Sequence, residues 1–266
     1  MTLLHIVVAA IAGGVLSTLA AAATLSMHAT WIPRLVSFAV GALLGAVFLE
    51  LLPHALEIGA AEPVMLTVLI GLLAFFLLEK LVLWRHAHGH GAHSDDRDES
   101  EHEHAMHTHG APATDGGRSG LMILIGNAVH SFCDGIVIAA AFIASDALGV
   151  ATTLAIVAHA VPQQVGDFAV LLHSGFARRR AFVYNVAAGI ATLVGALAAY
   201  IALAGMQRVL PVVLATAAAS LLYVAVADLI PSLHRRSEPS ETARQMLAIS
   251  LGVAVIAVAH VVLEPR

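Results

Sequence analysis

Two apolar segments in the middle of the chain carry polar residues that a membrane helix normally lacks. They read Gly126-Asn-Ala-Val-His-Ser-Phe-Cys-Asp-Gly135 and His159-Ala-Val-Pro-Gln-Gln-Val-Gly-Asp167. In each, a histidine precedes a carboxylate or a carboxamide by four residues: His130 with Asp134, and His159 with Gln163. Residues four apart share one face of a helix, so one metal ion could contact both side chains of a pair.

An ionised carboxylate near the middle of a bilayer costs about 3 kcal/mol or more unless a partner, an ion or water compensates for it. His130, Asp134 and His159 each lie about ten residues into their segments, which at about 1.5 Å per residue places them near mid-membrane. Imidazole and carboxylate suit Zn²⁺, Fe²⁺ or Mn²⁺, and neither is soft enough to select copper(I). We therefore predict that the two helices face each other and hold a divalent metal ion that crosses the membrane.

The composition indicates an integral membrane protein. Of 266 residues, 59% are hydrophobic and only 12% are charged, whereas soluble domains are about 25% charged. The net charge of -5 does not suggest a nucleic-acid partner. The single cysteine, Cys133, excludes an intrachain disulfide. The first residues lack a basic region before the apolar segment, so we expect no cleavable signal peptide.

Apolar stretches of about 20 residues predict eight membrane-spanning helices, and hence an all-α fold within the lipid bilayer. The expected spans are Leu3–Leu25, Leu35–Ile58, Val64–Leu83, Leu121–Ile143, Leu148–Leu172, Phe182–Ala204, Leu210–Leu233 and Met246–Leu263.

The basic residues predict the orientation of these spans. Connections after odd-numbered spans hold Arg34, Lys80, Arg85, Arg97, Arg118, Arg178, Arg179, Arg180, Arg235, Arg236 and Arg244, while the other side holds only Arg208 and Arg266. By the positive-inside rule, the odd-numbered connections are cytoplasmic and both termini lie outside.

An internal repeat relates the second and seventh spans. Residues 43–53, Leu-Leu-Gly-Ala-Val-Phe-Leu-Glu-Leu-Leu-Pro, align without gaps on residues 221–231, Leu-Leu-Tyr-Val-Ala-Val-Ala-Asp-Leu-Ile-Pro. Each copy has a carboxylate three residues before a proline, and the two spans run in opposite directions. Inverted repeats with a site at their interface are typical of transporters. The repeat predicts a 3+2+3 bundle: spans one to three in residues 1–85, spans four and five in 120–175, and spans six to eight in 181–266.

Residues 86–119 form the only long polar connection and hold eight of the sixteen histidines. With so few apolar residues, this segment is predicted to be disordered. We interpret its histidines as a weak metal-binding cluster, although a solvated or pH-sensitive linker would have the same composition.

Several other residues could contact the ion as it enters or leaves the site. Glu50 and His54 are four apart near the outer end of span two and predict an entry pair, with a simple ion pair as the alternative. Asn127 and Asp167 flank the two histidine pairs on the cytoplasmic side, where they would line an exit path. Pro162 lacks an N–H, which frees the carbonyl of Ala158 and is expected to kink the helix.

At these residues the sequence resembles the ZIP (Zrt/Irt-like protein) family of divalent metal transporters. The similarity is to the branch whose fourth span carries His-Asn-x-x-Asp-Gly and whose fifth carries His-Glu-x-Pro-x-Glu-x-Gly-Asp. It extends over nearly all eight spans, and it rests on His130, Asp134, Gly135, His159, Pro162, Gly166, Asp167 and the two copies of the repeat. The resemblance implies a two-metal site between spans four and five. It also implies an elevator-like or rocking cycle that carries zinc, or alternatively iron, manganese or cadmium, into the cytoplasm.

The chain departs from that family pattern at four positions. Ser131 replaces the asparagine, Ala160 and Gln164 replace glutamates, and Glu50 replaces the histidine of span two. The first metal site would keep His130, Asp134, His159 and Gln163, while the second retains only Ser131 and Gln163. Fewer anionic ligands should weaken binding and ease release. We therefore predict one functional transport site.

Two alternatives to a transporter remain at this stage. An intramembrane zinc hydrolase could use the histidines, Asp134 and Ser131 to activate water, although no His-Glu-x-x-His motif is present. A degenerate metal sensor without transport would fit the losses at Ala160 and Gln164. No ATP-binding motif is present to power a pump, so we expect a secondary transporter without enzyme activity or an organic cofactor. Composition suits a bacterial inner membrane, and the resemblance alone suggests a homodimer.

Overall fold

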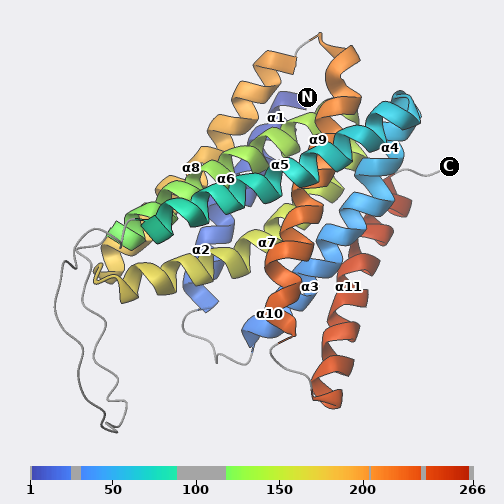
Figure 1. The fold of residues 1–266 in the computed structure, drawn as a ribbon. Coiled ribbons are helices and arrows are strands. Elements are labelled where there is room, and N and C mark those ends of the chain that lie inside the picture. The colour runs from blue at the N-terminus through green and yellow to red at the C-terminus, as the bar shows by residue number, and fades with distance from the viewer. Residues whose placement is uncertain (1, 25–30, 89–117, 204, 235–237, 264–266) are drawn as a thin grey trace, which may run out of the picture.

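The computed structural model describes residues 2–24, 31–88, 118–203, 205–234 and 238–263, which form a bundle of long helices (Figure 1). Within these residues, eight helical stretches are long and apolar enough to cross a membrane. This confirms the predicted all-α fold with eight spans. Most of the histidine-rich connection lies outside the described residues.

Three of the spans are interrupted by a π-helical turn and the others are regular. The first contains α1 (Thr2–Ile11), η1 (Ala12–Leu16) and α2 (Ser17–Thr24); the second contains α3 (Ile32–Gly45), η3 (Ala46–Leu51) and α4 (Leu52–Ile58). The third to sixth are α5 (Ala61–His88), α6 (Arg118–Ala144), α7 (Asp146–His173) and α8 (Arg178–Leu203). The seventh contains η4 (Gln207–Val209), α9 (Leu210–Tyr223), η5 (Val224–Leu229) and α10 (Ile230–Leu233), and the eighth is α11 (Pro239–Leu263).

Several helices extend beyond the predicted spans. α8 begins at Arg178 and α11 at Pro239, in both cases before the apolar stretch itself begins. Hydropathy identifies only the apolar part of a helix, which lies within the lipid. It therefore does not detect a polar first turn that extends the same helix. The π-helical turn at Gly13 and Gly14 was also not predicted.

The internal repeat is visible as two equivalent π-helical turns. η3 and η5 occupy matching positions of the two aligned segments, and each is followed at the second residue by a proline, Pro53 or Pro231. Leu52 N–H bonds to the carbonyl of Val47, and Ile230 N–H to that of Ala225, both five residues back. Proline lacks an N–H and clashes with the preceding turn, which accounts for the shift to this wider spacing.

The helices around α7 bring distant spans together. α7 packs against α6, α2 and α3, while α6 packs most extensively against α8 and α11 against α3. A glycine pair allows the closest of these approaches: a Cβ on Gly135 of α6 would lie 1.9 Å from the carbonyl oxygen of Thr192 in α8, and one on Gly195 of α8 would lie 2.0 Å from that of Phe132. Small residues at helix crossings are typical of membrane bundles.

A tight turn sets α6 and α7 side by side and antiparallel. α6 ends at Ala144 and α7 begins at Asp146, with the Ser145 hydroxyl accepting a hydrogen bond from the N–H of Leu148 as an N-cap. α7 then continues as one helix through Pro162. The two polar segments identified in the sequence therefore face each other across this helix pair.

Candidate metal centre

Three side chains from α6 and α7 converge near the middle of the two helices. His130 Nε2 lies 3.3 Å from His159 Nε2, and Asp134 Oδ2 lies 3.7 Å from the first and 3.5 Å from the second. No other group of three or more His, Cys, Asp or Glu side chains comes together in this way among the described residues. We refer to these three side chains as the His–Asp cluster.

The spacing of the His–Asp cluster suits a shared metal ion. Zinc binds nitrogen and oxygen ligands at about 2.0–2.2 Å, and in a tetrahedral site two such ligands stand about 3.4 Å apart. The carboxylate distances of 3.5 and 3.7 Å are long for direct hydrogen bonds but fit ligands on either side of a small cation. Three ligands leave the fourth position of a tetrahedron open for water or another group.

One histidine of the cluster is oriented by the backbone. His159 Nδ1 lies 3.2 Å from the carbonyl oxygen of Ala155, one turn earlier on α7. A carbonyl only accepts hydrogen bonds, so this contact favours the tautomer with its proton on Nδ1, which leaves Nε2 as the nitrogen that can bind a metal ion. Nε2 is also the atom that lies near His130 and Asp134. An N–H that fixes the tautomer of the ligating imidazole is a usual feature of metal sites.

Burial of the cluster is uneven. His159 is 1% exposed and Asp134 is 5% exposed, whereas the His130 side chain is 24% exposed. A buried carboxylate in a bilayer requires a compensating positive charge. A divalent ion between the three side chains would supply that charge, and His130 is the member of the cluster that an approaching ion can reach.

A second polar cluster lies about one helical turn away, toward the N-terminal end of α6. Asn127 Oδ1 accepts hydrogen bonds from Ser131 Oγ and from Gln163 Nε2, both at 3.4 Å. We refer to Asn127, Ser131 and Gln163 as the amide cluster. It contains no ionisable group. Gln163, predicted as a ligand of the first site, donates a hydrogen bond to Asn127 in this structure.

Two further predicted site residues lie near the amide cluster on α7. Gln164 is 2% exposed, and its Oε1 has no hydrogen-bond partner among the described residues. Asp167 is half-buried one turn further along the helix. Ala160, at the position of the first missing glutamate, is buried and apolar. The structure therefore places one carboxamide, of Gln164, and one methyl group, of Ala160, where the family pattern would supply carboxylates.

The predicted entry residues have other neighbours. Glu50 Oε1 lies 3.2 Å from Nδ1 of His260 in α11, and His54 Nδ1 lies 3.9 Å from Glu57 Oε2. His260 was not identified from the sequence, because its partner Glu50 is in another span. Asn127 was noted only as flanking the site, whereas in the structure it joins Ser131 to Gln163.

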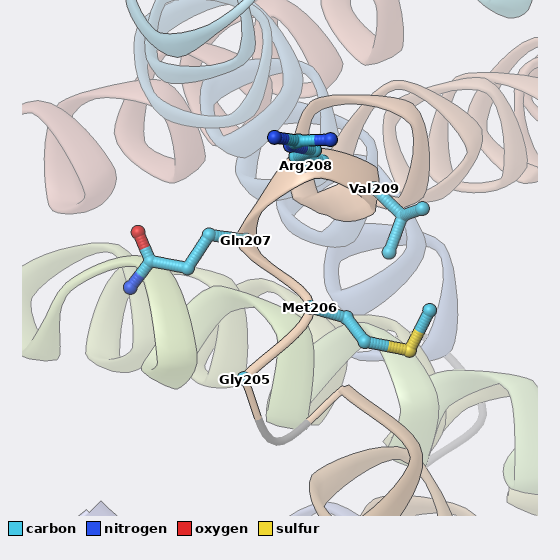
Figure 2. Close-up of a pocket in the computed structure, with 5 residues that line it drawn as sticks. All are labelled: Gly205, Met206, Gln207, Arg208 and Val209. Carbon is cyan, nitrogen blue, oxygen red and sulfur yellow. The ribbon is translucent and has the colours of Figure 1, made fainter.

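The structure also has a pocket whose lining includes none of these residues. It has a volume of about 430 Å³ and is lined by Gly205, Met206, Gln207, Arg208 and Val209 in the turn between α8 and α9. In Figure 2 the Gln207 and Met206 side chains extend away from each other on this turn. Nothing in its lining matches the metal-binding chemistry of the His–Asp cluster.

Comparisons with known proteins agree with this geometry. A family model described as ZIP Zinc transporter matches residues 1–260. The chain is 30% identical to Zinc transporter ZIP13 of Mus musculus over 255 residues, covering 87% of this chain and 70% of that protein. It is 28% identical to the Zinc transporter ZIP13 homolog of Drosophila melanogaster, covering 86% and 78%. It is also 40% identical to Zinc transporter ZIP4 of Homo sapiens over 120 residues, covering 44% and 18%.

The family model covers nearly the whole chain, including the first seven spans, most of the eighth and both polar clusters. This confirms the resemblance noted in the sequence. It also places the protein among multi-pass membrane transporters rather than enzymes, which removes the hydrolase alternative. The chain belongs to the ZIP zinc transporter family.

Proposed function

We propose that this protein carries zinc through the membrane by way of the His–Asp cluster, without hydrolysing ATP. The observation that supports this most directly is the convergence of three ligand atoms within 3.3–3.7 Å of one another, from two antiparallel helices. The family to which the chain belongs and the zinc named in its relatives favour that ion. Two imidazoles and one carboxylate form a borderline ligand set suited to it.

The proposed direction is into the cytoplasm. The amide cluster, Gln164 and Asp167 continue from the His–Asp cluster toward Arg118 at the start of α6 and toward the end of α7. Arg178–Arg180 follow that end of α7, at the start of α8. The positive-inside rule assigns this basic end to the cytoplasm and both termini to the outside. The relatives named above are animal proteins, so the choice of a bacterial inner membrane rests on composition alone.

The proposed transport site is single. The His–Asp cluster keeps an anionic ligand, whereas the amide cluster offers only neutral oxygens and nitrogens. Neutral ligands bind a divalent cation more weakly than carboxylates, so an ion that leaves the first cluster would pass the second without being held. A homodimer remains a prediction from the resemblance.

Uptake into proteoliposomes tests this function. We expect the native chain to take up Zn²⁺ in preference to Fe²⁺, Mn²⁺ and Cd²⁺, and we expect His130→Ala to abolish uptake because it removes the accessible ligand. Binding of Zn²⁺ without uptake of any of the four ions would contradict transport and favour the sensor. Uptake that survives His130→Ala would show that the ion takes another path.

A further inference from the structure

Three consecutive arginines begin α8, just after the end of α7. Arg178, Arg179 and Arg180 are all exposed. The ion pairs formed among the described residues include none of the three. We refer to these residues as the arginine triplet. Its positive charge has no counter-charge within the part of the chain that the structure describes.

Other arginines on the same side of the proposed topology do have partners in the chain. The guanidinium of Arg244 donates a hydrogen bond to Glu241 at 2.6 Å. The guanidinium of Arg34 lies 5.1 Å from the centroid of the Trp31 ring, as in a cation–π contact. The arginine triplet therefore differs from these residues in more than its position at the end of a span.

The start of a helix is an unfavourable place for three cations. The N-terminal end of a helix carries a partial positive charge, and neighbouring like charges repel each other. The first turn of α8 contains no acidic residue that would offset this charge. An anion from outside the chain would therefore stabilise this end of α8.

The outer face of α8 leads directly to the arginine triplet. α8 lies at the edge of the bundle (Figure 1), and Val183, Ile190 and Val194 are exposed on it. Their spacing of seven and four residues places them on one face of the helix, and Arg179 and Arg180 precede Val183 by four and three residues on that face. Exposed apolar side chains of a membrane-spanning helix contact lipid tails. A lipid on this face would have its head group at the two arginines.

Aromatic side chains beside the arginine triplet support a position at the membrane surface. The rings of Phe176 and Tyr184 meet edge to face, with their centroids 5.6 Å apart. Tyrosine is enriched at the level of the lipid head groups. Arginine stays charged and can bind two phosphate oxygens at once. We propose that Arg179 and Arg180, with Arg178 beside them, bind the phosphate of an anionic phospholipid whose tails lie along α8.

The proposed lipid site is joined to the helix of the metal centre by a small apolar cluster. Ala181, the residue after the arginine triplet, packs with Phe168 and Leu171 near the end of α7. α7 also carries His159. A bound lipid would thus hold the connected ends of α7 and α8 at the membrane surface. Because a ligand that binds only the folded state stabilises it, anionic lipid should also raise the unfolding temperature.

Lipid retention by the purified full chain tests this site. The protein is incubated in detergent micelles with equal amounts of dioleoyl-phosphatidylglycerol and dioleoyl-phosphatidylcholine, and the lipids that remain after gel filtration are measured. We expect the native chain to prefer phosphatidylglycerol by about tenfold, and Arg179→Gln with Arg180→Gln to reduce the preference to about twofold. The matched control, Arg34→Gln with Arg244→Gln, removes the same charge from arginines that have partners and should keep the native preference.

An unchanged preference in the Arg179→Gln, Arg180→Gln variant would overturn the site, and so would an equal loss in the control. Unfolding temperatures in phosphatidylcholine micelles identify a variant that fails to fold. In that case Arg179→Lys with Arg180→Lys, which keeps the charge, provides the comparison: it should retain a preference within about threefold of native, and a complete loss would overturn the site.

Two other anions could occupy the arginine triplet, and the same experiment separates them from a lipid. Loss of the preference in the presence of inorganic phosphate would show that the arginines bind free phosphate, which would overturn the lipid site. No preference in the native chain would also overturn it, and would favour the acidic stretch of residues 95–103 as the partner. The measurement involves no zinc, so its result is independent of the proposed transport function.

Discussion

The His–Asp cluster and the amide cluster lie one turn apart on the same two helices, yet their chemistry differs. The first brings two imidazoles and a carboxylate within 3.7 Å of one another. The second joins Asn127, Ser131 and Gln163 by hydrogen bonds and contains no ionisable group. A helix pair can thus carry two adjacent polar clusters, of which only one has the ligand types that a divalent cation prefers.

Removal of the carboxylate from the His–Asp cluster should have the largest effect. Asp134→Asn keeps the size of the side chain but removes the only anionic ligand, so we expect Zn²⁺ uptake to fall to the level of empty vesicles. Asp146→Asn is the matched control, because Asp146 is an exposed acid at the start of α7. Comparable uptake by the two variants would show that the carboxylate of Asp134 does not bind the ion.

The position of the cluster depends on the close contact between α6 and α8. A Cβ at Gly135 would overlap the carbonyl of Thr192, whereas one at Gly126 would meet no atom within 4 Å. Gly135→Ala should therefore lower the free energy of unfolding by about 1–3 kcal/mol, while Gly126→Ala should not lower it. Thermal unfolding of the purified protein in detergent measures the difference. Equal stability of the two variants would mean that the contact is not tight.

A carboxylate restored beside the amide cluster should convert it into a holding site. Gln164→Glu places a negative charge where a buried carbonyl oxygen has no hydrogen-bond partner within the part of the chain that the structure describes. We expect Zn²⁺ to bind about tenfold more tightly and to be released more slowly, with a lower maximal uptake rate. Gln245→Glu, the same change on α11, is the control. If Gln164→Glu and Gln245→Glu bound zinc with equal affinity, the missing charge at Gln164 would not explain the difference between the two clusters.

The hydrogen bonds within the amide cluster should have the smallest effect. Asn127→Leu removes the acceptor shared by Ser131 and Gln163, and its coupling to Gln163→Leu should be about 1 kcal/mol in a double-mutant cycle of unfolding free energies. Zn²⁺ uptake should fall by no more than about threefold, because no ligand is lost. A complete loss of uptake would identify Asn127 as part of the transport site rather than as a support for its neighbours.

Local sequence patterns predicted much of the fold and of the first cluster. His130 and Asp134 are four apart on one helix, and His159 lies on the next helix, so a short turn was enough to bring the three together. The sequence repeat around Pro53 and Pro231 likewise predicted that the second and seventh spans correspond to each other. A proline perturbs the helix in which it lies, so the two copies share the same irregular turn. The eight spans followed from hydropathy.

Contacts between distant spans could not be predicted in this way. The pairing of Glu50 with His260 depends on how α11 packs against the second span, and the sequence of either helix alone carries no signal for it. Asn127 was similarly underestimated, because its two hydrogen bonds depend on which rotamers Ser131 and Gln163 adopt. The π-helical turn at Ala12–Leu16 is not followed by a proline and so had no comparable marker in the sequence.

The most direct test of the difference between the two clusters is an anomalous-difference map at the zinc absorption edge, from crystals of the full chain grown with Zn²⁺. We predict that the strongest peak within the spans lies about 2.0–2.2 Å from His130 Nε2, His159 Nε2 and Asp134 Oδ2. No peak of similar height should lie at Asn127, Ser131 and Gln163. A strongest peak at the amide cluster, with none between the two histidines, would show that the ion is held in the other site.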